Sequence, residues 1–114
     1  MATVKLEKSA WKPYFDQVST TLVGKQAEIE TASLKIGDQI DAEWVGLRGI
    51  AYDPGKDLVD IMLEGSDHLV RHPRDIYVEQ GPLGVTSMEV IDTDDVRQII
   101  KLRDPLMLPY VGNA

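Results

Sequence analysis

The period of the hydrophobic pattern changes at Gly24, and this change limits the possible folds more than any other feature of the chain. Before Gly24, large apolar residues recur every three or four positions, which is the period of one face of an α-helix. The members of this set are Trp11, Tyr14, Phe15, Val18 and Leu22. After Gly24, apolar and polar residues alternate, as in a strand with one buried face. The sequence therefore predicts one helix followed by a sheet.

The predicted helix starts at Ser9, a residue type that caps helix N-termini, and ends near Gly24. Pro13 lies in the first turn, where its missing N–H has little or no intrahelical partner to lose, so it limits the helix start without breaking the helix. The aromatic stripe fits two interpretations, packing into a core and lining a ligand. Its helical spacing favours the core.

Alternating runs fill the rest of the chain, at residues 27–31, 39–44, 49–52, 58–64, 68–71, 76–79, 85–91 and 96–102. In the second run, Ile40, Ala42 and Trp44 are expected to face the core, with a bulge near Gly46 before the next run. Turn signals recur at roughly 8 to 12 residues, which favours antiparallel neighbours over parallel βαβ units. We therefore expect an α+β fold, with one N-terminal helix packed on a curved, mainly antiparallel sheet or small open barrel.

The length of 114 residues fits one domain, which we expect to span residues 1–114. Residues 105–114 form an apolar tail bounded by Pro105 and containing Pro109. Two interpretations of this tail stay open. It packs across the core as a strap, or it docks a partner or a second copy of the chain.

Charge and composition exclude several function classes. The chain has 12 Lys and Arg against 19 Asp and Glu, and a net charge of −7 repels nucleic-acid phosphates and anionic membrane surfaces. We therefore expect no nucleic-acid or membrane partner. The absence of cysteine excludes disulfides, thiolate nucleophiles and cysteine-ligated zinc. No signal-peptide or membrane-spanning apolar run is present, so we expect cytoplasmic residence.

Chemistry concentrates between residues 67 and 74, which hold both histidines and two of the twelve basic residues. The candidate ligand-binding residues are His68, Arg71, His72 and Arg74. The two arginines suit a carboxylate or phosphate, although pairing with neighbouring surface acids is the simpler and favoured interpretation. Pro73 disfavours a helix here, and in a regular strand the histidines lie roughly 13 Å apart, too far for one metal to bridge. We therefore expect no metal and no cofactor, while a site using one histidine and a nearby acid stays open.

Catalytic signatures are missing elsewhere in the sequence. The run 65–68 puts a serine, an aspartate and a histidine side by side, but these residues also make an ordinary turn, and a triad depends on spatial roles. The acidic run 92–95 lacks the glycine and terminal glutamate of a calcium loop. No catalytic residue is assigned.

The order of several short motifs resembles a family of small bacterial proteins of unknown function. The motifs are Trp11-x-x-Tyr14-Phe15-Asp16, Ala27-Glu28-Ile29-Glu30, Ile36-Gly37-Asp38-Gln39, and Asp67-His68-Leu69-Val70 before Pro73 and Ile76. The resemblance covers residues 8–108 and is one of overall pattern. It implies a bacterial single-domain protein and supplies no catalytic residue.

The function is unknown at this stage, and three hypotheses remain. The absent active-site signature and the apolar tail favour a non-enzymatic protein that acts by protein interaction or self-association. The alternative is a small-anion or metal-binding site, with a possible enzymatic role, around residues 68–74. A third possibility is an apolar pocket inside the sheet, although most interior positions are needed to fill the core.

Overall fold

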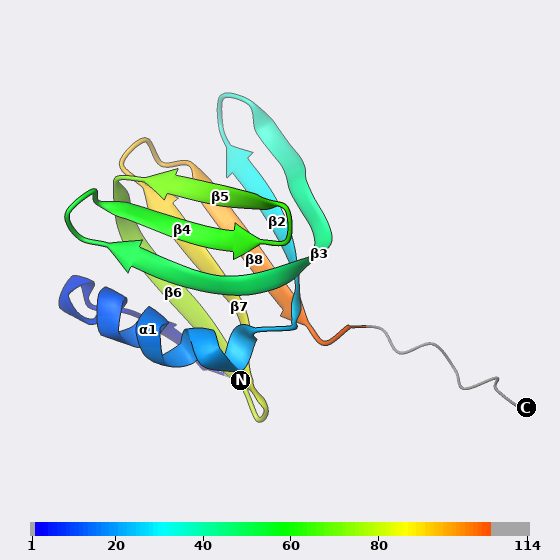
Figure 1. Ribbon diagram of the computed structural model, residues 1–114. Helices are drawn as coiled ribbons and strands as arrows, with labels where there is room; N and C mark the ends of the chain where they lie inside the picture. Colours follow the sequence, from blue (N-terminus) through cyan, green and yellow to red (C-terminus); the bar gives the residue numbers. More distant parts are fainter. Residues whose placement is uncertain (1, 106–114) are drawn as a thin grey trace, which may run out of the picture.

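The computed structural model of the chain describes residues 2–105 and contains one α-helix and eight strands within them (Figure 1). A short 3-10 turn, η1 (Lys8–Ala10), precedes the helix α1 (Trp11–Leu22). The strands are β1 (Ala2–Lys5), β2 (Gln26–Ser33), β3 (Gly37–Asp53), β4 (Leu58–Leu63), β5 (Ser66–Arg71), β6 (Pro73–Gly81), β7 (Gly84–Asp92) and β8 (Arg97–Arg103). Most of the predicted tail, residues 106–114, lies outside the described residues.

Helix α1 confirms the prediction from apolar spacing. Its residues Trp11, Phe15 and Leu22 are buried in the core. The expected cap at Ser9 is wrong, because Ser9 lies inside η1 and Ala10 precedes the helix without a side-chain cap. Within residues 2–105, no helix is long and apolar enough to cross a membrane.

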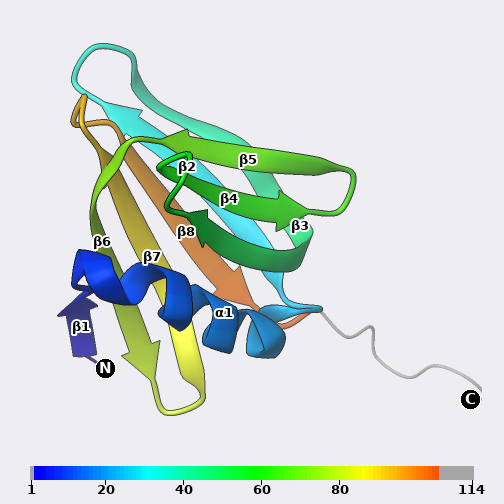
Figure 2. The same ribbon diagram turned by 60° about the vertical axis from the view of Figure 1, so that its left-hand side comes forward.

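All neighbouring strands are antiparallel and form an open eight-stranded sheet in the order β1-β6-β7-β8-β2-β3-β4-β5. The expectation of one helix on an antiparallel sheet is therefore confirmed, and the sheet does not close. Strand β3 is unusually long: its first part pairs with β2 and its second part with β4. We call β4, β5 and the second part of β3 the small sheet, and the other strands with the first part of β3 the large sheet. Figure 2 shows the small sheet crossing over the large one.

The core lies between the two sheets and α1. The fully buried side chains of largest volume are Trp11, Phe15, Leu22, Ile29, Ile50, Ile61, Ile76, Ile100, Val59, Val78 and Val90. They come from the helix and from strands of both sheets, each of which contributes an apolar face. Burial of this set is the main force that holds the sheets together.

The first part of β3 departs from simple alternation. Ile29 of β2 is opposite Ala42, but the next residue, Glu30, is opposite Ile40, so the pairing skips Asp41. Such a bulge moves every later side chain to the other face. The prediction that Ile40 faces the core is therefore wrong, and its side chain is 51% exposed. A second irregularity follows near Trp44, whose φ is +53°.

Helix α1 covers the edge of β3 opposite β4. The Ile50 N–H on this edge donates a hydrogen bond to Ser19 Oγ of the helix at 3.0 Å. A Cβ on Gly49 would lie 2.6 Å from the same oxygen, so the close approach of helix and strand requires glycine there. The hydroxyl thus supplies the acceptor that a further strand would have provided.

Replacing Ser19 with alanine tests this contact. We expect Ser19→Ala to lower the free energy of unfolding by about 1 to 3 kcal/mol, because the Ile50 N–H loses its acceptor. Urea denaturation measures the change. Thr20→Ala is the control, because the exposed Thr20 hydroxyl bonds only within its own helix, to the Gln17 carbonyl. Equal effects of the two substitutions would contradict a special role for Ser19.

Candidate functional site

The segment that carries both histidines divides between two places in the fold. Strand β5 ends at Arg71, and His72 has a φ of +54°, a left-handed conformation that breaks the alternation of side chains. His68, within β5, points to the inner face and is half-buried, whereas the His72 side chain is 67% exposed. The two histidines have different neighbours and do not share a ligand site.

His68 begins a series of polar contacts that we call the interior polar chain. Its Nε2 lies 2.6 Å from Gln98 Oε1 on β8, and this oxygen is 3.0 Å from the Thr31 hydroxyl on β2. Thr31 also contacts a carboxylate oxygen of Asp41 on β3. Gln98 and Thr31 are 8% and 7% exposed, so the chain links β5 to the large sheet through buried polar groups.

The Asp41 bulge explains how this acidic residue joins the chain. Because the pairing of β2 with β3 skips Asp41, its side chain is turned beside Thr31 on the inner face. The Thr31 hydroxyl has one proton for two oxygen neighbours. Rotating the Gln98 side-chain amide by half a turn exchanges its oxygen and nitrogen, so that each contact has one hydrogen to share. The amide nitrogen then donates to Thr31 and to His68, and the Thr31 hydroxyl donates to Asp41.

His72 belongs instead to a group that we call the Asp57 cluster, formed with Lys8, Tyr52 and Asp57. The Asp57 carboxylate accepts a 2.7 Å hydrogen bond from the Tyr52 hydroxyl and lies 3.4 Å from His72 Nδ1 and 3.8 Å from Lys8 Nζ. Asp57 has a φ of +48°, and its carbonyl accepts the His72 N–H at 2.9 Å. Two left-handed residues therefore face each other at this corner of the small sheet.

The Asp57 cluster changes the titration of two of its members. The Tyr52 hydrogen bond, with His72 and Lys8, holds the pKa of Asp57 below its usual value. Burial, and next the bond to Asp57 and its charge, raise the pKa of Tyr52 to about 12. At neutral pH the Tyr52 hydroxyl is therefore uncharged and donates the hydrogen bond to Asp57.

A groove of about 450 Å³ runs beside the cluster, and its lining is Lys8, Ser9, Lys12, Pro13, Tyr52, Pro54 and Asp57. Both lysines have a carboxylate nearby: Lys12 Nζ is 2.7 Å from Asp16, and Lys8 Nζ is 3.8 Å from Asp57. The positive charge in the groove is therefore largely compensated, and an anion gains little attraction from it.

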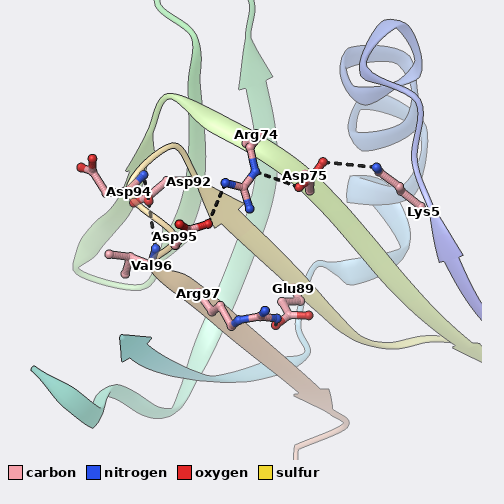
Figure 3. A network of polar contacts seen from close by, with 9 residues as sticks. All are labelled: Lys5, Arg74, Asp75, Glu89, Asp92, Asp94, Asp95, Val96 and Arg97. Atoms are coloured by element: carbon pink, nitrogen blue, oxygen red, sulfur yellow. Dashed lines mark hydrogen bonds and ion pairs between the residues drawn. The ribbon is translucent and has the colours of Figure 1, made fainter. Parts of the chain in front are cut away.

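The two arginines of the sequence-predicted site are also apart from the interior polar chain. Arg74 bonds to Asp75 at 2.9 Å and to Asp95 at 2.7 Å, and Asp75 also pairs with Lys5 at 3.3 Å (Figure 3). Arg71 is exposed at the end of β5. Surface pairing, the simpler of the two sequence interpretations, describes Arg74. Anion binding by His68, Arg71, His72 and Arg74 stays a prediction.

The acidic turn 92–95 makes its own hydrogen bonds. Asp92 Oδ1 accepts the backbone N–H groups of Asp94 at 2.8 Å and Val96 at 3.1 Å, as Figure 3 shows. The carboxylate is therefore used to shape the turn. Over residues 2–105, no group of three or more His, Asp or Glu side chains is arranged to hold a metal ion.

Sequence reasoning missed Thr31, Gln98, Tyr52 and Asp57. Thr31 and Gln98 occupy inward positions of alternating strands, where a polar residue gives no sign of its partner. Asp57 meets His72 only because β4 and β5 form a hairpin that pairs Leu58 with Arg71. Predicting these contacts requires the cross-strand register, and the hydrophobic pattern does not give the register to within one residue.

Removing the central amide tests the interior polar chain. We expect Gln98→Met, which keeps similar volume, to lower the free energy of unfolding by about 1 to 3 kcal/mol, because His68 and Thr31 lose buried partners. Chemical denaturation measures it. Gln80→Met on β6 is the control, since Gln80 is exposed and has only a 3.4 Å contact to Tyr14. An unchanged stability in Gln98→Met would contradict the structural role of the chain.

The Asp57 cluster predicts a pH dependence. Because the pKa of Asp57 is lowered, its ionised form stabilises the fold above the ordinary value of 3.8, and this contribution disappears as pH falls through the folded-state pKa. Asp57→Asn should therefore be less stable than the wild type at neutral pH, with the difference shrinking as the pH falls below 3.8. Urea midpoints across this range measure it. The Tyr52→Phe background is the control, where the same substitution should cost less.

Comparison with known proteins adds no activity. The chain is 37% identical over 110 residues to an uncharacterized protein of Aquifex aeolicus (strain VF5), an alignment that covers 96% of this chain and 99% of that protein. No solved structure matches. A family model for a family of unknown function, DUF5335, matches residues 2–111. The chain therefore belongs to the DUF5335 family.

Proposed function

We propose that this protein acts without catalysis, by binding an extended segment of a cationic partner protein along an uncovered strand edge. The edge is formed by residues 37–45 of β3, and we call it the open β3 edge. Among the described residues, these positions pair with β2 on one side only, because β4 pairs with β3 from Leu47 onward. The single-sided pairing is the observation that carries the proposal. Unpaired backbone groups on an edge are the ligands for strand addition.

Charge indicates the chemistry of the partner. The open β3 edge carries Asp38, Asp41 and Glu43 and has no lysine or arginine. The whole chain has a net charge of −7, which adds long-range attraction for a basic segment. A strand with alternating lysine or arginine would meet this edge with complementary charge.

Apolar residues at the same end of the molecule offer additional contact area. Leu34 and Ile36, in the turn before β3, are 107% and 62% exposed, and Ile40 on the edge is 51% exposed. A groove of about 780 Å³ lies beside this turn and is lined by Ser33, Leu34, Lys35, Ile36, Asp94, Asp95, Val96 and Arg97. Apolar groups of a bound segment have surfaces to cover there.

Self-association through this edge is less favourable than a cationic partner. Two copies paired edge to edge would bring the carboxylates of one copy close to those of the other, and like charges across strands destabilise pairing. The other uncovered edges differ in charge: β1 carries Lys5, and β5 carries both Asp67 and Arg71. Only the open β3 edge is uniformly acidic. Cytoplasmic residence stays an expectation, as does a small-anion or metal site around residues 68–74.

A synthetic peptide tests the proposal. We expect a short peptide in which lysine alternates with valine to shift backbone NMR signals of residues 37–45 and to slow their amide exchange, because the peptide hydrogen-bonds to them. The double variant Asp38→Lys, Glu43→Lys should weaken binding by at least about tenfold, or about 1.4 kcal/mol. Both side chains are exposed, so the fold is expected to persist.

The control peptide has glutamate in place of lysine and should not bind. A matched protein control is Glu7→Lys, Asp16→Lys, which changes the net charge equally at exposed positions next to and on helix α1, away from the open β3 edge. The proposal fails if the lysine peptide leaves residues 37–45 unchanged, or if both double variants lose binding equally. Light scattering of the free protein adds a check, since dimerisation through the same edge would favour self-association instead.

A further inference from the structure

The outer face of the small sheet has an unusual residue at its centre. Asp60 of β4 is opposite Ala51 of β3 and Leu69 of β5, so these three side chains form one row across the sheet. The rows on either side contribute Leu58 and Met62 from the same strand, because residues two apart share a face. The carboxylate thus has apolar neighbours across the sheet and along its own strand, with Asp53, Arg71 and Asp67 at the corners of the same face.

One oxygen of this carboxylate has no partner. Asp60 Oδ1 is buried from solvent and makes no hydrogen bond with the described residues. A carboxylate oxygen that is removed from water without a donor is costly, and such groups in folded proteins call for a physical explanation. The neighbouring apolar side chains remove water, while the opposite face of β4 is committed to the core through Val59 and Ile61.

This face is also uncovered within residues 2–105. The substantial contacts of β4 are with β3 and β5 alone, and Leu69 is 42% exposed. In Figure 1, β4 and β5 lie in front of the large sheet, and no helix or strand is drawn across them. Asp67 lies on the same face, two residues from Leu69, and its negative charge together with burial raises the pKa of Asp60.

We propose that the outer face of the small sheet is a second docking surface, for a partner protein segment that presents an arginine between apolar side chains, with the guanidinium donating to Asp60. Arginine fits better than lysine, because its planar group is weakly hydrated and can donate to two carboxylate oxygens at once. Leu58, Met62 and Leu69 then contact the apolar neighbours of the arginine. This inference uses residues 58–69, none of which belongs to the open β3 edge, so either proposal can fail alone.

The probe is the capped tripeptide acetyl-Leu-Arg-Leu-amide. Its control is the same peptide with citrulline, which has nearly the same shape but no charge. We expect the arginine peptide to shift backbone NMR signals of residues 49–53, 58–63 and 66–71, and to bind at least about tenfold more tightly than the citrulline peptide. Signals of residues 37–45 should remain unchanged, which separates this surface from the strand edge.

Two protein variants complete the test. Asp60→Asn should weaken binding of the arginine peptide by at least about tenfold, whereas Asp94→Asn, which removes the same charge from an exposed turn, should not. The fold should tolerate Asp60→Asn, because the substitution removes a poorly solvated charge; circular dichroism verifies this. If that variant does not fold, Leu69→Lys at a 42% exposed position replaces it and should also weaken binding, because the added positive charge repels the arginine.

Three results would overturn the inference. Equal binding of the arginine and citrulline peptides would remove the role of charge. Retained binding in folded Asp60→Asn, or in Leu69→Lys, would move the contact elsewhere. Signal changes confined to residues 37–45 would assign the cationic peptide to the strand edge alone.

Discussion

The transfer of β3 from one partner strand to another is the constraint on which the rest of the structure depends. At this point the Leu47 N–H donates to the Lys25 carbonyl before β2, while the Gly46 carbonyl accepts the Glu64 N–H after β4. Adjacent residues thus serve the two sheets. A Cβ on Gly46 would lie 2.5 Å from the Glu64 carboxyl carbon, so a larger residue there would displace the exposed Glu64 side chain. The guanidinium of Arg103 lies 4.0 Å from the Trp44 ring centre and covers the strongly bent segment next to it.

Because of this transfer, the second part of β3 is covered along both edges, whereas the first part is covered along one edge. The second part has β4 on one side and helix α1 on the other, where Ser19 satisfies the backbone. The first part has β2 on one side, and the described residues put nothing against its other side. Covering both edges of one long strand would need a further element, and the chain devotes its only described helix to one of them. Acidic side chains on the remaining edge disfavour its pairing with another acidic strand.

Regular features could be predicted from the sequence, and local irregularities could not. The helix and the strands after residue 58 follow their apolar periods and turn residues, because one face of each is committed to the core. In β3 the pattern of Ile40, Ala42 and Trp44 looks regular, but one extra residue at Asp41 reverses the facing of Ile40. The position of a bulge depends on the pairing with the partner strand, so the sequence of one strand alone does not determine it.

The candidate site was less predictable than the fold for a related reason. Nearness in sequence placed His68 and His72 together, but a left-handed φ at His72 sends them to different surroundings. Their true neighbours, Gln98 and Asp57, are 30 and 15 residues away along the chain. Polar partners across strands need a register that is accurate to one residue, whereas a hydrophobic pattern tolerates small errors.

The interior polar chain gives the molecule an uneven distribution of local stability. Strand β5 pairs with β4 along one edge, and on the inner face Val70 and the His68 contact with Gln98 tie it to the rest of the protein. Water can replace a hydrogen bond far more easily than it can replace apolar packing. Because β5 is an edge strand held in this way, we expect it to detach from β4 at a lower free-energy cost than global unfolding, while the large sheet keeps its pairing.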